Sequence, residues 1–88
     1  MKIVFWPTAW DDYLEWKAED AKSLARLDSL IEQCMRDPFR GTCKPEPLGQ
    51  NLAGWWSRRI CREHRLVYRV TGKGDGQALE VAQCRYHY

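Results

Sequence analysis

The sequence has 88 residues, of which 44% are hydrophobic and 12% are aromatic, and its formal net charge at pH 7 is +2. This length supports one domain, residues 1–88, and the aromatic content excludes an intrinsically disordered chain. No apolar run approaches the roughly 20 residues of a membrane helix, and no signal-peptide pattern begins the chain, so we expect a cytoplasmic protein without membrane contact.

The N-terminal part of the chain is predicted to form one strand and two helices. Residues 2–6 (KIVFW) are rich in strand-forming side chains. Thr8 and Asp11 have the spacing of a capping box and predict the start of the first helix. Asp20 is predicted to cap the second helix, and Pro38 to end it. Apolar stripes on both segments indicate a scaffold of two paired helices with no chemistry of its own.

The C-terminal part is predicted to be a loop followed by three strands. Residues 39–51 contain two Gly and two Pro, which is typical of a loop. Strand-like runs follow at 55–61, 66–71 and 78–84. The order strand, helix, helix, strand meander predicts an α+β fold, with both helices packed on one face of a mostly antiparallel sheet. The other face of the sheet is therefore expected to carry the function.

Arginines are concentrated in the first two of these strands. Residues 1–40 carry a net charge of −2 and residues 41–88 a net charge of +4. An antiparallel pairing that places Arg59 opposite Arg65 would bring two guanidinium groups together, which is unfavourable unless an anion binds between them. Arginine suits bidentate contacts with phosphate, although a solvated strand face explains the charge equally well. A polyanion such as RNA is the candidate partner of this basic region, and the candidate contacts are Lys44, Arg58, Arg59 and Arg62.

Four cysteines lie at positions 34, 43, 61 and 84. Their spacing matches neither a zinc-binding knuckle nor a redox pair. We expect reduced thiols in mostly apolar surroundings, and no metal or other cofactor.

Three groups in the C-terminal half fit the chemistry of RNA cleavage. The ribose 2′-OH attacks its own 3′-phosphate, so the reaction needs a base, an acid for the leaving 5′-oxygen, and positive charge on the phosphoryl oxygens. Glu46 is the candidate base, His87 the candidate acid and Arg65 the candidate phosphate ligand, and Tyr88 can hydrogen-bond the phosphate or stack on a base. This set of roles requires no metal ion.

Each of these residues also has a simpler interpretation. Glu46 can be an ordinary solvated loop carboxylate between two prolines, and His87 can be a frayed terminal side chain. His64 fits a turn residue better than a catalytic one. The residues by themselves leave both interpretations open.

Four segments closely resemble the YoeB toxins, a family in the RelE/ParE superfamily of bacterial toxin–antitoxin systems. The segments are WDDYLEW at 10–16, KPEPL at 44–48, NLAGWWSRRICREHRLVYRV at 51–70 and CRYHY at 84–88. They occur in the family's order and cover essentially the whole chain. One departure is Gly49, where relatives often carry a lysine.

The resemblance implies a microbial-ribonuclease-like fold and a type II toxin. It further implies a ribosome-dependent endonuclease that cleaves mRNA in the ribosomal A site and blocks translation. By this resemblance, the family's general base corresponds to Glu46, its general acid to His87 and its terminal tyrosine to Tyr88. The phosphate-stabilising arginine falls on Arg65, with Arg59 assisting.

The resemblance also implies protein partners. A YefM-like antitoxin, whose disordered C-terminal part folds over the toxin, is the expected inhibitor, and the aromatic content is compatible with a homodimer. Two other functions remain open: a ParE-like gyrase poison on the same scaffold, and a simple RNA- or protein-binding module. Neither would need an acid–base pair.

Overall fold

The computed structural model describes residues 1–86. Five strands, two α-helices and two short 3-10 helices follow one another along the chain. In order they are β1 (Lys2–Phe5), α1 (Pro7–Glu19), α2 (Ala21–Arg36), β2 (Glu46–Pro47), η1 (Gln50–Leu52), β3 (Trp56–Cys61), β4 (His64–Thr71), η2 (Gly74–Gly76) and β5 (Ala78–Gln83). Neither helix is long and apolar enough to cross a membrane, among the residues that the structure describes.

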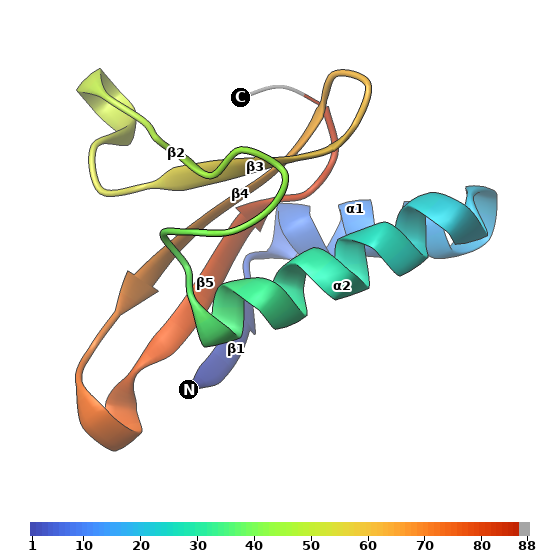
Figure 1. The fold of residues 1–88 in the computed structure, drawn as a ribbon. Coiled ribbons are helices and arrows are strands. Elements are labelled where there is room, and N and C mark those ends of the chain that lie inside the picture. The colour runs from blue at the N-terminus through green and yellow to red at the C-terminus, as the bar shows by residue number, and fades with distance from the viewer. Residues whose placement is uncertain (87–88) are drawn as a thin grey trace.

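The strands form one mixed sheet in the order β1-β5-β4-β3-β2. Only β1 and β5 run parallel, and the other neighbours are antiparallel. The parallel pair follows from the helical connection, because the chain leaves β1 through α1 and α2 before it builds the meander. Both helices lie on the same side of the sheet (Figure 1). The predicted α+β architecture is confirmed.

The two helices begin in different ways. Asp20 caps α2, since its carboxylate accepts a hydrogen bond from the Ser23 N–H at 3.1 Å, as predicted. The predicted capping box at Thr8 is wrong: α1 begins one residue earlier, at Pro7, and Trp6 is the N-cap without a side-chain hydrogen bond. Proline suits this first position because its missing N–H would have had no partner inside the helix.

The core lies between the helices and the sheet. Leu27, Leu30 and Cys34 of α2 are fully or almost fully buried against strand residues. The strand side chains that meet them include Leu66 and Tyr68 of β4. Burial of these apolar side chains fixes which face of each strand points away from the helices, and that open face carries Arg59, Arg65 and Arg69.

Arg58 is the exception among the arginines, because its side chain is fully buried on the helix side of the sheet. Its Nη2 donates to the backbone oxygens of Asp37 and Arg40, each at 2.7 Å, and its Nε donates to the Tyr68 hydroxyl at 3.2 Å. The prediction that Arg58 contacts RNA is therefore wrong. Its guanidinium is used to hold the loop that follows α2.

Arg69 lies on the open face, but it is paired. Its guanidinium forms a 3.0 Å ion pair with Glu80 of β5 and lies 4.4 Å from the centre of the Trp55 ring. Arg69 therefore links β4 to β5 and packs on the Trp55 indole, so its role on the open face is structural.

Candidate active site

A small polar pocket of about 70 Å³ lies on the open face where β2, β3 and β4 meet. We call it the basic pocket. Three of its side chains are cationic and one is a carboxylate, and all of these four were predicted as site residues. Its lining consists of Lys44, Glu46, Ser57, Arg59 and Arg65.

Strand register brings these side chains together. Glu46 pairs with Ser57 across β2 and β3, and Arg59 pairs with Arg65 across β3 and β4. The second pairing is the register that the sequence analysis considered, in which the two guanidinium groups come together. The Arg59 N–H also donates to the Cys43 oxygen at 2.9 Å, so the loop before β2 is held along β3.

The electrostatics of the basic pocket favour an anion. Two guanidinium groups on directly opposed strand positions repel each other unless negative charge lies between them. Among the described residues, neither Arg59 nor Arg65 forms an ion pair, and the buried Nη1 of Arg65 has no hydrogen-bond partner. A buried donor without a hydrogen-bond partner is unfavourable. A phosphoryl oxygen would satisfy it.

Glu46 is presented by the shortest strand of the sheet. It is an exposed residue in β2, where Pro47 continues the strand at the sheet edge, a position that tolerates proline because no ladder partner is lost. Beyond the basic pocket, Glu46 also lines a wider hollow of about 440 Å³ formed with the loop of residues 47–52. The carboxylate thus stands between a small cationic pocket and a larger open space.

Lys44 lies in the loop before β2 with a left-handed backbone, at φ 51°. Cys43 before it also has a positive φ, of 63°. Two consecutive non-glycine residues in this region are uncommon in proteins. The turn brings the ammonium group of Lys44 to the pocket in which Glu46 lies.

The C-terminal segment reaches the same end of β4. The Arg65 N–H donates to the Tyr86 oxygen at 3.1 Å, and the Tyr86 N–H donates to Nδ1 of His64 at 2.8 Å. In Figure 1 the red end of the chain lies beside the turn between β3 and β4. The predicted residues His87 and Tyr88 lie outside the described residues.

The lining of the basic pocket differs from the predicted set of site residues at two positions. Ser57, which is 2% exposed, lines the basic pocket and was not predicted, because only the pairing of β2 with β3 reveals it. Arg62 lies at the turn after β3 and lines a separate hollow of about 260 Å³ near the start of α2. The structure does not bring Arg62 to the basic pocket, and its contact with RNA stays a prediction.

All four cysteines are free, as expected. Within residues 1–86, no group of three or more His, Cys, Asp or Glu side chains is placed to hold a metal ion.

Comparison with known proteins places this geometry in a family. Residues 5–88 match the family model described as the YoeB-like toxin of the bacterial type II toxin–antitoxin system. Toxin YoeB of Escherichia coli (strain K12) is 49% identical over 88 residues, covering all of both chains. Toxin YoeB of Streptomyces coelicolor is also 49% identical over the full length of both.

Solved structures agree with this match. The YoeB/ParE toxin from Agrobacterium tumefaciens superposes with a TM-score of 0.96 at 52% identity, covering all of both chains. A heterotetrameric YoeB–YefM toxin–antitoxin complex from Staphylococcus aureus contains a chain that is 39% identical, with a TM-score of 0.86, over 100% of this chain and 98% of that one. A YoeB dimer from the same organism has a TM-score of 0.86 at 38% identity, with the same coverage.

A mixed sheet with two helices on one face and a cationic pocket on the other defines a toxin of the RelE/ParE superfamily. Within it, the chain belongs to the YoeB-like toxins of bacterial type II toxin–antitoxin systems.

Proposed function

We propose that this toxin is a ribosome-dependent endoribonuclease that cleaves mRNA in the ribosomal A site and so arrests translation. The observation that carries the proposal is the basic pocket of about 70 Å³, lined by a carboxylate and by two guanidinium groups that form no ion pair with any described residue. A carboxylate beside a phosphate-binding pair is the arrangement that in-line attack by a ribose hydroxyl requires.

In the proposed reaction Glu46 removes the proton from the 2′-OH, and the 2′-oxygen forms a bond with the adjacent phosphorus. The bond from phosphorus to the 5′-oxygen breaks, and His87 supplies the proton that this oxygen takes up. The products are a 2′,3′-cyclic phosphate and a free 5′-hydroxyl, so no water or outside nucleophile enters this step. Tyr88 is assigned a hydrogen bond to the phosphate or stacking on a base.

Arg65 and Arg59 stabilise the negative charge that develops on the phosphoryl oxygens, and Lys44 adds a third cation at the rim. The partnerless Nη1 of Arg65 supports this assignment, because a fixed donor that does not need to reorganise stabilises the transition state strongly. The reaction as written uses protein groups alone, and we propose that it is independent of metal ions.

Dependence on the ribosome is supported by the size of the pocket. The basic pocket has room for a phosphoryl group and little more, so it gives few contacts that would orient a flexible mRNA. A ribosome that holds the codon in a fixed geometry would supply this orientation, whose contribution to rate is large.

Two protein partners complete the proposal. A YefM-like antitoxin would neutralise the toxin by placing an acidic segment on the open arginine face, and a YoeB–YefM complex is known for a Staphylococcus aureus relative. A second copy of this chain is the other proposed partner, since a dimer is known for a relative from the same organism.

The test is primer extension on an mRNA in a purified translation system, with and without ribosomes. Glu46→Gln keeps the size and polarity of the side chain but removes the base, so we expect cleavage to fall by at least about 100-fold. Glu32→Gln is the matched control, because Glu32 lies on the exposed side of α2 and pairs only with Arg36. His87→Gln tests the proposed acid in the same assay.

Cleavage that requires ribosomes, survives EDTA and is lost in both Glu46→Gln and His87→Gln supports the proposal. Full cleavage by Glu46→Gln would exclude the assigned base. Growth arrest with DNA damage and no cut mRNA would instead indicate a gyrase poison.

A further inference from the structure

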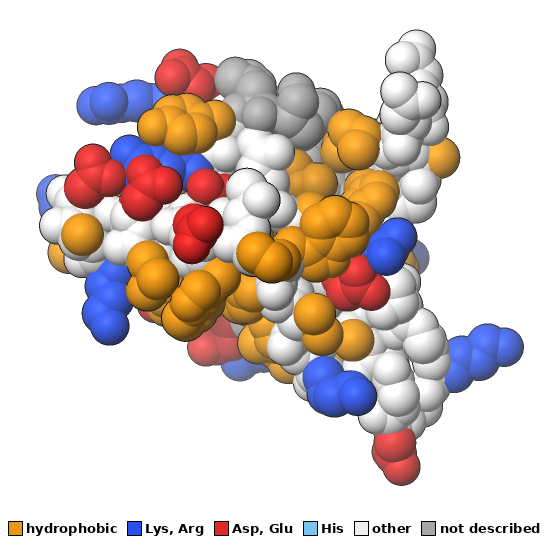
Figure 2. Space-filling model, turned by 180° about the vertical axis from the view of Figure 1, so that it is seen from behind, with side chains coloured by type: hydrophobic (Ala, Val, Ile, Leu, Met, Phe, Trp, Pro, Cys, Tyr) orange, Lys and Arg blue, Asp and Glu red, His pale blue; other side chains and the backbone are white. Residues whose placement is uncertain are grey.

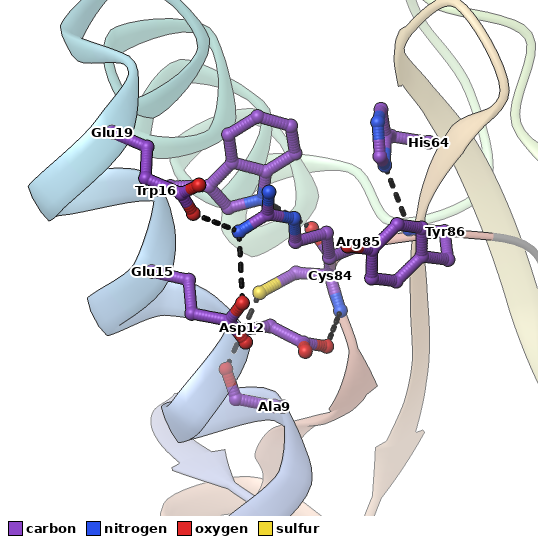
Figure 3. Close-up of polar contacts among 9 residues, drawn as sticks. All are labelled: Ala9, Asp12, Glu15, Trp16, Glu19, His64, Cys84, Arg85 and Tyr86. Carbon is purple, nitrogen blue, oxygen red and sulfur yellow. Dashed lines mark hydrogen bonds and ion pairs between the residues drawn. The ribbon is translucent and has the colours of Figure 1, made fainter.

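Residues 84–86 follow β5 and belong to no strand, but hydrogen bonds hold them in place. The Arg85 oxygen accepts from Nε2 of Gln83 at 2.8 Å, and both backbone groups of Cys84 and of Tyr86 are also hydrogen-bonded. A chain end is usually poorly ordered unless something ties it down. Here most of the ties come from side chains of α1 and β4, which Figure 3 shows converging on this segment.

Helix α1 holds Cys84 from two sides. The Asp12 carboxylate accepts from the Cys84 N–H at 3.1 Å, and the Trp16 indole N–H donates to the Cys84 oxygen at 2.7 Å. The Cys84 thiol itself approaches the Ala9 oxygen at 3.4 Å. All of these contacts are buried, so their geometry is shielded from water.

The same helix holds the next side chain by charge. Nη1 of Arg85 lies 2.7 Å from a Glu19 oxygen and 3.1 Å from a Glu15 oxygen, one helical turn apart. Its guanidinium also lies 4.7 Å from the centre of the Trp16 ring and 5.3 Å from that of Tyr86. The Arg85 side chain is only 12% exposed, whereas both glutamates are about half exposed.

Strand β4 completes the arrangement on the other side. His64 packs its ring edge-on against Trp16 at 4.8 Å and accepts the Tyr86 N–H at Nδ1. Tyr86 has a left-handed backbone, at φ 63°, and its oxygen accepts the Arg65 N–H. The chain therefore turns sharply at Tyr86, at the residue whose backbone bonds to the phosphate-binding arginine.

We propose that Asp12, Glu15, Trp16 and Glu19 of α1, with His64 of β4, form a tail clamp, and that Glu15 and Glu19 act through Arg85 as positioning residues for the cleavage reaction. The inference rests on the proposed function, because the clamped segment leads directly into the proposed acid, His87. Holding residues 84–86 against Arg65 removes the conformational freedom that a terminal histidine would otherwise have to lose at every turnover.

If the ion pairs of Arg85 with Glu15 and Glu19 were purely structural, their loss would lower the stability of the fold. Ion pairs whose acidic partners are half exposed contribute little to folding stability, and Arg85 lies two residues beyond the end of β5, outside the sheet. Loss of the glutamates should therefore leave the fold intact while it loosens the tail. Arg85 also holds the pKa of the Glu19 carboxyl below its usual range, so both partners stay charged around neutral pH.

The test uses Glu15→Gln/Glu19→Gln in the full chain. We expect the rate of the cleavage step to fall by about 10- to 100-fold, because small misplacement of a catalytic group is costly. KM should stay within about twofold, since neither glutamate contacts the substrate. The melting temperature should match that of wild type, and Glu32→Gln is again the control, because Glu32 is an exposed acid on the neighbouring helix that also pairs with an arginine.

A double-mutant cycle identifies the route through Arg85. Arg85→Gln should reduce cleavage to the same level as the glutamate double variant, and the triple variant should be no slower than either. Multiplicative losses would overturn the proposal, because the glutamates would then act independently of Arg85.

Amide hydrogen exchange gives a readout that does not depend on activity. The N–H groups of Cys84 and Tyr86 should be protected in the wild-type protein, and protection of Tyr86 should fall in Glu15→Gln/Glu19→Gln while the strands stay protected. A slow double variant with an unchanged tail would overturn the clamp, as would a double variant that cleaves at the wild-type rate. A wild-type protein that cleaves no mRNA would instead overturn the proposed function.

Discussion

Arg58 and Arg59 are consecutive in the chain and serve opposite purposes. Strand alternation turns Arg58 toward the helices, where backbone oxygens accept its hydrogen bonds. The same alternation turns Arg59 toward the basic pocket, where no described residue forms an ion pair with it. The same side chain is therefore structural at one position and available to a ligand at the next.

Exchanging each of these arginines for leucine should separate the two roles. Arg58→Leu removes the hydrogen bonds that the guanidinium donates to the backbone oxygens of Asp37 and Arg40 and to the Tyr68 hydroxyl, so we expect the free energy of unfolding to fall by about 2–4 kcal/mol. Arg59→Leu should change it by less than about 0.5 kcal/mol, but should slow mRNA cleavage. Urea denaturation followed by tryptophan fluorescence measures the first effect and primer extension the second. Equal loss of stability in both variants would contradict this division.

Asp12 is a buried carboxylate, and burial raises its pKa above the ordinary value. The Cys84 N–H and the Arg85 guanidinium oppose this shift, whereas Glu15 and Asp11 add to it. Because the pKa is higher in the folded state than in the unfolded state, protonation of Asp12 favours folding. This contribution is present at low pH and is lost as the pH rises through the raised pKa.

Asp12→Asn keeps an oxygen that can accept the Cys84 N–H but cannot titrate. We therefore expect the stability of the variant, relative to wild type, to increase as the pH is raised from about 4 to 7. Urea denaturation at both pH values provides the comparison. A difference that is independent of pH would mean that Asp12 has an ordinary pKa in the folded protein.

At the scale of elements, local patterns predicted most of the fold. The apolar stripes of α1 and α2, the alternation in β3 and β4 and the Asp20 cap were all visible in the sequence, because each depends on residues a few positions apart. Strand β2 was missed, since two residues carry no periodicity and its pairing with β3 is a long-range contact. The part that α1 takes in holding residues 84–86 was missed for the same reason: its partners are about 70 positions apart.

In the candidate site, too, the sequence predicted what depends on local pattern and missed what depends on long-range contacts. Charge pointed to Arg59 and Arg65 as candidate site residues, and the needs of RNA cleavage together with the family resemblance pointed to Glu46, whereas the register that unites the two arginines was considered as one possible pairing and is given by the structure. Alternation also placed Arg58 on the opposite side from Arg59, but the local sequence gave no sign of the loop oxygens that bury it.

The turn between β4 and β5 gives a prediction at this scale. Gly72 has a positive φ of 77°, and a Cβ at this position would collide with the backbone of Gly76. Gly72→Ala should lower the free energy of unfolding by about 1–3 kcal/mol, whereas Gly76→Ala, which meets open space, should be nearly neutral. Thermal unfolding of the two variants measures this difference. A stable Gly72→Ala protein would show that the turn can relax without cost to the strands.

At the scale of the whole molecule, the basic pocket and the apolar hollow lie in separate regions. The basic pocket is formed at the β2 side of the sheet, while an apolar hollow of about 230 Å³ lies at the opposite side, where β1 meets the helices. Figure 2 shows apolar side chains gathered on one face of the molecule, with acidic side chains beside them. Ile3 and Trp10, which line this hollow, are 43% and 48% exposed, and Leu14 on the next turn of α1 is 43% exposed.

This apolar surface is the proposed contact with a second copy of the chain. A large exposed ring beside a hollow is typical of an interface anchor, and a ring of this kind contributes strongly to association. We expect wild-type protein to sediment as a dimer and Trp10→Ser to dissociate at least about 10-fold more readily, as measured by sedimentation equilibrium. Phe39→Ser is the control, because Phe39 is equally exposed at 48% but packs on Trp56, away from the hollow. A wild-type monomer at all concentrations, or equal weakening by both variants, would place the dimer contact elsewhere or exclude it.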